Sequence, residues 1–164
     1  MIVLGVDPGS HATGYGVIST GPVVRMLAGG VIRARKGAPL SERLLEINSA
    51  LNDVIAAHEP DAMAVEDLFN AKNARSSLIL GHARGVILLA GATAGLAVQE
   101  YAPREVKKAL TGNGAATKEQ VRFMVMRLLA LKEAPPLDES DALAGVRITP
   151  PVNMRTTGPV AITP

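Results

Sequence analysis

Short apolar runs that end at turn residues or acids predict β-strands in several parts of the chain. The predicted strands cover residues 2–6, 15–19, 23–34, 62–65 and 98–101. The first two form a hairpin around the Pro-Gly-Ser turn at residues 8–10, and Gly29–Gly30 indicates a bulge or break in the third. The first strand ends at Asp7, and the strand at residues 62–65 delivers Glu66 at its carboxyl end.

Apolar positions that recur every three or four residues predict helices in the rest of the chain. These helices cover residues 40–58, 73–97, 103–110 and 117–131, and a last one begins near Asp138. Ser41 is available to cap the first helix, and Thr117 with Gln120 has the spacing of a capping box. Strands followed by alternating helices and strands predict an α/β fold, in which an antiparallel part of a mixed sheet adjoins a βαβ part.

Glycine and alanine are unusually frequent in the predicted helix at residues 73–97. It contains Gly81, Gly85, Gly91 and Gly95, each of which costs roughly 1 kcal/mol relative to Ala inside a helix. Small residues let another surface approach closely, so this helix is our candidate for an interface between two subunits.

Composition limits the class of protein. The chain has 164 residues, 48% of them hydrophobic, which suits one domain with a single core. The absence of cysteine excludes disulfides and thiolate metal sites, and it fits a reducing compartment, so we expect a cytoplasmic protein. We expect no signal peptide and no membrane span, and a disordered Pro-rich tail at residues 149–164.

Four acidic residues are candidates for a metal site. Asp7 and Glu66 each end a predicted strand, and Asp138 and Asp141 share one face at the start of a helix. Oxygen ligands without cysteine suit Mg²⁺ or Mn²⁺, and two such ions could hold an attacking water and a leaving oxygen in line at a phosphodiester. Taken singly, Asp7 could instead cap a turn and Asp138 could cap a helix.

Charge and aromatic residues suggest a nucleic-acid partner. Residues 101–127 contain six basic and two acidic side chains, although the whole chain has a net charge of only +2. Four of these cations flank the glycine loop at residues 112–114 and could contact phosphates: Lys107, Lys108, Lys118 and Arg122. Phe69 could stack on an unpaired base or pack in the core, and Phe123 is expected in the core or at a subunit interface.

Four motifs occur in a fixed order along the chain. They are residues 5–17 (GVDPGSHATGYGV), Glu66 with Phe69 and residues 73–85, residues 101–108 with 111–114 and 118–121, and residues 138–144 (DESDALA). Together they resemble the bacterial RuvC crossover junction endonucleases over about residues 1–148. The resemblance implies a ribonuclease H-like domain, with a five-stranded mixed sheet flanked by helices. It also implies a homodimer that resolves four-way Holliday junctions by symmetrical paired nicks in recombination and DNA repair.

The same resemblance implies roles for individual residues and partners. Asp7, Glu66, Asp138 and Asp141 match the catalytic acids, which would hold two Mg²⁺ ions per subunit, with Mn²⁺ as a substitute. Phe69 matches the aromatic residue that stacks on bases of the opened junction, and Lys107 and Lys118 match lysines that contact DNA. The branch-migration proteins RuvA and RuvB are the implied partners.

Three other interpretations are compatible with parts of this pattern. A YqgF-type RNA-processing nuclease would carry a similar acid cluster. It would differ from a junction endonuclease in its substrate, which a comparison of cleavage of a four-way junction, RNA and linear duplex would reveal. An actin-like nucleotide-binding protein would use the loop after Asp7 for phosphate, but the chain offers no convincing second phosphate loop. A non-catalytic DNA-binding module would be excluded by metal-dependent nicking.

Overall fold

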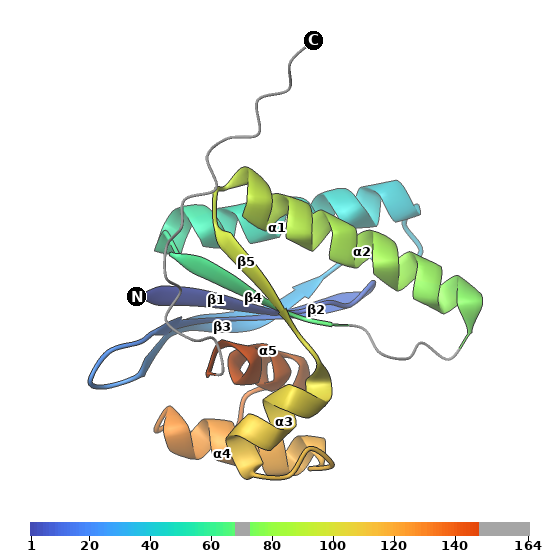
Figure 1. Ribbon diagram of the computed structural model, residues 1–164. Coiled ribbons are helices and arrows are strands. Elements are labelled where there is room, and N and C mark those ends of the chain that lie inside the picture. The colour runs from blue at the N-terminus through green and yellow to red at the C-terminus, as the bar shows by residue number, and fades with distance from the viewer. Residues whose placement is uncertain (68–72, 148–164) are drawn as a thin grey trace.

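A five-stranded sheet of order β3–β2–β1–β4–β5 forms the centre of the computed structural model, which describes residues 1–67 and 73–147 (Figure 1). The strands are β1 (Ile2–Asp7), β2 (Ala12–Ser19), β3 (Arg25–Arg33), β4 (Ala62–Glu66) and β5 (Ala97–Tyr101). The first three strands are antiparallel, whereas β4 runs parallel to β1 and β5 runs parallel to β4. The predicted mixed sheet and its hairpin are therefore confirmed.

Helices cover both faces of this sheet (Figure 1). They are α1 (Leu40–His58), α2 (Ala74–Thr93), α3 (Pro103–Thr111), α4 (Lys118–Leu128) and α5 (Leu137–Arg147). Helices α1 and α2 lie on one face, and α3, α4 and α5 lie on the other (Figure 1). The Thr117–Gln120 capping box is present at the start of α4, as predicted.

Side chains that alternate along the strands divide the core into two layers. On β1, Leu4 and Val6 belong to the cluster that α1 and α2 cover, whereas Val3 belongs to the cluster under α3, α4 and α5. Asp7 is an even number of positions from Val3, so both side chains project from the same face of the sheet. Its side chain is therefore directed to the face that α5 covers.

The irregularity in the sheet lies two residues away from the predicted position. Gly29 and Gly30 pair regularly with β2, and the register shifts at Val17–Ile18, so that Leu27 is the extra residue on β3. Gly29 has another purpose, because a Cβ there would lie 2.5 Å from Oε1 of Glu139 on α5. The prediction was wrong because a glycine in a strand can indicate close packing as well as a bulge.

Two helix ends also differ from the prediction. Ser41 is not the cap of α1, since the helix begins at Leu40 and Pro39 occupies the capping position without a side-chain hydrogen bond. Gly95 lies outside α2, where its φ of +73° and the hydrogen bond from the Leu96 amide to the Gly91 carbonyl terminate the helix.

Helix α4 ends three residues earlier than predicted. It ends at Leu128, and Ala130 has a φ of +51°, so the chain leaves the helical path before residue 131. An alanine in this conformation gives no sequence signal, because only glycine and asparagine adopt it readily.

The expectation that no segment is long and apolar enough to span a membrane was wrong for α2. By length and composition alone this helix qualifies, with 20 residues and a mean hydropathy of 1.3, and 22% of that segment is buried. A single such helix is weak evidence for a membrane. In this fold α2 packs on the sheet through Ala83, Ile87 and Ala90.

Candidate active site

Two of the four predicted acids stand side by side at the carboxyl ends of parallel strands. The last registered pair between β1 and β4 is Val6 with Val65, and Asp7 and Glu66 are the next residues of the two strands. Alternate side chains of a strand project from the same face. Asp7 therefore shares a face with Val3, and Glu66 shares a face with Ala64, and both Val3 and Ala64 belong to the cluster on the α5 side of the sheet. The topology therefore brings together residues that are 59 positions apart in the chain.

Glycines allow α5 to bring the other two acids to this edge of the sheet. A Cβ on Gly14 would lie 2.0 Å from the carbonyl oxygen of Asp138, and one on Gly5 would lie 2.1 Å from that of Ala142. Gly16 makes a similar close approach to Leu143. The backbone of α5 consequently lies directly on β1 and β2, a contact that any larger residue would prevent.

The charges of the acids affect one another. Burial raises the pKa of Asp7 to about 8, and the charges of Glu66, Asp141 and Asp138 act in the same direction, while Lys118 opposes them. Burial and the charge of Asp141 raise the pKa of Glu66 to about 7, against the influence of Lys118 and Lys107. All four predicted acids therefore contribute to one field of negative charge.

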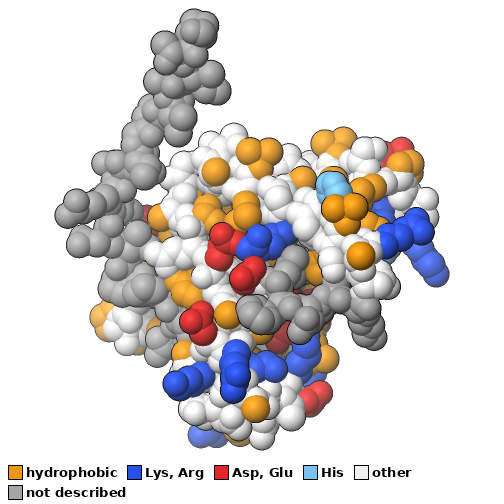
Figure 2. Space-filling model, turned by 45° about the vertical axis from the view of Figure 1, so that its right-hand side comes forward, with side chains coloured by type: hydrophobic (Ala, Val, Ile, Leu, Met, Phe, Trp, Pro, Cys, Tyr) orange, Lys and Arg blue, Asp and Glu red, His pale blue; other side chains and the backbone are white. Residues whose placement is uncertain are grey.

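Lys118 provides positive charge within this cluster. Its Nζ donates a hydrogen bond to Oδ2 of Asp141 at 2.5 Å, and the Asp141 side chain is only 13% exposed. Lys107 and Lys118 line a cavity of about 120 Å³ together with Glu66 and Asp141. Lys and Arg side chains gather at the end of the molecule formed by α3 and α4, close to acidic ones (Figure 2).

The donor set fits a hard divalent cation, although the acids are not arranged as a complete ligand shell. Across residues 1–67 and 73–147, no three carboxylate or histidine residues are grouped so that they could hold an ion as they stand. Lys118 instead takes up an oxygen of Asp141. The remaining chemistry suits Mg²⁺ or Mn²⁺, because all four donors are carboxylates, and burial together with neighbouring negative charge raises the pKa of two of them, Asp7 and Glu66.

Comparison with protein families decides the wider assignment. Residues 3–149 match the model of the family described as crossover junction endodeoxyribonuclease RuvC. The chain belongs to the RuvC family. Its members include the RuvC of Chlorobaculum parvum, 53% identical over 145 residues that cover 87% of this chain and 78% of that protein. The RuvC of Desulforamulus reducens is 49% identical, over 88% of this chain and 90% of its own length.

Solved RuvC structures have the same fold. Thermus thermophilus RuvC matches with a TM-score of 0.80 and 38% identity, covering 89% of this chain and 91% of its own. A structure of T. thermophilus RuvC in complex with a Holliday junction substrate matches with a TM-score of 0.84 and 39% identity, over 89% of this chain and 90% of its own. The predicted ribonuclease H-like architecture is confirmed by these two matches.

The remaining predicted DNA contacts are Lys108, Arg122 and Phe69. Lys108 is exposed and Arg122 is half-buried, and neither lines the cavity that contains Glu66 and Asp141. Phe69, the expected base-stacking residue, lies outside the described residues, as do residues 149–164. The roles of these three side chains remain predictions.

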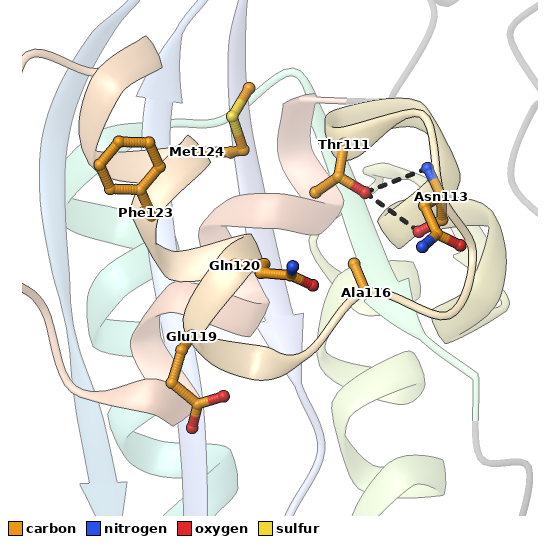
Figure 3. A pocket seen from close by; sticks show the side chains of 7 residues that line it. All are labelled: Thr111, Asn113, Ala116, Glu119, Gln120, Phe123 and Met124. Atoms are coloured by element: carbon orange, nitrogen blue, oxygen red, sulfur yellow. Dashed lines mark hydrogen bonds between the residues drawn. The ribbon is translucent and has the colours of Figure 1, made fainter.

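A second, more open cavity of about 540 Å³ lies between α4 and the loop that precedes it (Figure 3). In this loop Thr111 accepts a hydrogen bond from the Asn113 amide and donates one to its carbonyl. Phe123 lines the cavity and is 59% exposed, so it does not pack in the core of the chain. Of the two expected places for Phe123, the core was wrong because α4 buries Val121 and Val125 instead, and the subunit interface stays a prediction.

Sequence reasoning missed an ion-pair cluster directly behind Glu66. Arg84 of α2 contacts Asp67 at 3.0 Å and also pairs with Glu100 of β5. This cluster fixes the chain where it leaves β4, on the face opposite to Glu66. The available signal was a single arginine among the apolar residues in the middle of α2, a place where a charge is kept only if it has partners.

Proposed function

We propose that this chain is a Holliday junction resolvase that hydrolyses phosphodiester bonds with divalent cations held by Asp7, Glu66, Asp138 and Asp141. The observation that supports it is the meeting of Asp7 and Glu66 at one sheet edge, under a helix that carries the two aspartates. Membership of the RuvC family, a family of metal-dependent nucleases, supports the same activity.

Each part of the chain has a defined task in this mechanism. The four carboxylates would hold Mg²⁺, with Mn²⁺ as a substitute and two ions per subunit, and Lys107 and Lys118 would contact the phosphates beside them. Bound ions would activate the attacking water and stabilise the leaving oxygen. Burial of Asp7 lowers the local dielectric constant and strengthens these interactions. Phe69, three positions after the end of β4 in the sequence, would stack on an unpaired base.

We further propose that the active form is a homodimer, because two nicks related by a two-fold axis need two sites related by the same axis. An apolar groove of about 390 Å³ between α1 and α2 supports this. It is lined by Leu44, Leu78, Gly81, His82, Gly85, Val86 and Leu89. Leu45, Leu78 and Leu89 are more than 60% exposed, and hydrophobic side chains surround a histidine on this part of the surface (Figure 2).

We propose RuvA and RuvB as partners, because branch migration moves junctions to the point where a resolvase cuts them. The proposed site of action is the bacterial cytoplasm. The deciding experiment is a nicking assay on a synthetic four-way junction with and without Mg²⁺. We expect paired nicks only when Mg²⁺ is present. Equal or better cleavage of RNA would instead favour a YqgF-type activity, and binding without cleavage would favour a non-catalytic module.

A further inference from the structure

Lys118 joins two helices at the centre of the acid cluster. It is the first residue of α4, and its ammonium group donates to an oxygen of Asp141, which lies on α5 and 23 positions later in the chain. The Lys118 side chain is 52% exposed, whereas that of Asp141 is 13% exposed. The lysine therefore reaches from the surface to a carboxylate that is largely, though not fully, buried.

The ammonium group of Lys118 takes up an oxygen of Asp141, one of the four proposed metal ligands. Its charge favours the ionised forms of both Asp7 and Glu66, and their charges in turn act on Lys118. Lys107 lines the same cavity, but within the described part of the chain no hydrogen bond or ion pair joins it to any of the four acids. Of these two cations, Lys118 is the one with a direct carboxylate contact.

We propose that Lys118 competes with the metal ion for Asp141 in the free protein, and that a DNA phosphate draws it away, so that DNA binding and metal binding promote each other. This inference rests on the proposed function, because it takes Asp141 as a metal ligand. An ammonium group and a divalent cation on the same small carboxylate repel each other at short range. Either one therefore weakens the binding of the other.

The flexible stem of lysine makes the exchange possible. Lysine carries a compact charge on four rotatable carbons, and Lys118 lies at the exposed start of α4, where the positive end of the helix dipole also favours a phosphate. Once Lys118 contacts DNA, Asp141 regains both oxygens for the ion. By thermodynamic reciprocity, the factor by which DNA tightens metal binding equals the factor by which metal tightens DNA binding. DNA binding thereby promotes metal binding at Asp141.

The first test measures Mn²⁺ binding to the full-length protein by titration calorimetry without DNA. We expect Lys118→Met to bind Mn²⁺ about tenfold more tightly than the wild type, a coupling of ordinary size. Lys107→Met removes the same charge from the same cavity and is the matched control, for which we expect a much smaller gain. Lys118→Arg retains a cation and is expected to bind Mn²⁺ weakly, like the wild type. Equal gains in the two Met variants, or no gain in Lys118→Met, would overturn the proposal.

The second test measures coupling with the substrate. The affinity for a four-way junction is determined by fluorescence anisotropy with and without Ca²⁺, an oxygen-binding cation of flexible geometry. We expect Ca²⁺ to tighten junction binding about tenfold in the wild type and much less in Lys118→Met. Equal coupling in both proteins would overturn the proposal.

Failure of this inference is distinguishable from failure of the proposed function. If the wild type nicks junctions with Mg²⁺ but the lysine variants show neither effect, only the competition is refuted. If the wild type neither binds Mn²⁺ nor nicks a junction, the metal-site assignment itself is wrong.

Discussion

Asp7 is the acid on which the proposed chemistry depends most, because its field includes contributions from the other three. We expect Asp7→Asn to keep junction binding and to lose cleavage, by roughly 100-fold or more, since an amide supplies neither the charge nor the second oxygen ligand. Binding by gel shift and nicking by single-turnover kinetics would separate the two effects. A variant that nicks at the wild-type rate would remove Asp7 from the active site.

The raised pKa values of Asp7 and Glu66 predict how stability depends on pH when no metal is added. The unfolded chain releases these protons near pH 4, whereas the folded chain holds them to about pH 8 and about pH 7. Between these values the folded state binds more protons, so its stability falls as the pH rises. In EDTA we expect Tm to fall by several degrees between about pH 5 and about pH 8, and by less in Asp7→Asn.

Added Mg²⁺ should recover most of that loss at about pH 8 and have little effect at about pH 5, because only ionised carboxylates bind the ion. Differential scanning calorimetry at the two pH values would measure this. A Tm that is independent of pH in EDTA would contradict the burial of these two acids.

At the residue scale, the sequence predicts the acids better than it predicts their neighbours. Asp7 and Glu66 could be paired in advance, because parallel strands deliver their carboxyl ends to one edge. The Lys118–Asp141 contact could not, since it depends on how α4 and α5 lie against each other. The same is true of Arg84, whose two partners come from different strand ends.

At the scale of elements, the approach of α5 to the sheet determines whether Asp138 and Asp141 reach the site. Gly14→Ala would place a methyl group 2.0 Å from the Asp138 carbonyl oxygen, a backbone atom that cannot turn aside. We expect a loss of about 1–3 kcal/mol in the free energy of unfolding and a strong loss of cleavage as the start of α5 moves away. Urea unfolding and the nicking assay would measure the two effects.

Gly145→Ala is the matched control on the same helix. A Cβ there would meet no atom of residues 1–67 and 73–147 within 4 Å, so the substitution should leave cleavage intact and stabilise α5 by up to about 1 kcal/mol. Equal effects of the two substitutions would show that close packing at Gly14 is unimportant. The sequence pattern placed Gly14 in the turn before a strand at residues 15–19, whereas it lies within β2, and its close contact with α5 was not predictable, because it depends on an element more than 100 residues away.

At the scale of the whole molecule, the order of strands and helices was predictable because each element carries its own periodicity. Helix α1 was predicted at its exact limits, since its apolar stripe is bounded by Pro39 and Pro60. The limits of α2 and α4 were not, because Gly95 and Ala130 end them through backbone conformation. The surface of α2 illustrates the same limitation: its composition cannot distinguish a core helix, a membrane span and a subunit interface.

A substitution on the exposed surface of α2 tests whether this surface is a subunit interface. Leu89 is 62% exposed in the α1–α2 groove, and replacing it by Glu would bury a charge if a second copy packs there. We expect Leu89→Glu to sediment as a folded monomer that nicks the two strands of a junction independently. Phe123→Ser is the control, because Phe123 is similarly exposed, at 59%, but lies on α4 beside the other cavity; if the α1–α2 groove is the subunit interface, this substitution should leave the dimer intact. A Leu89→Glu protein that remains dimeric would show that the two active sites are paired through a different surface.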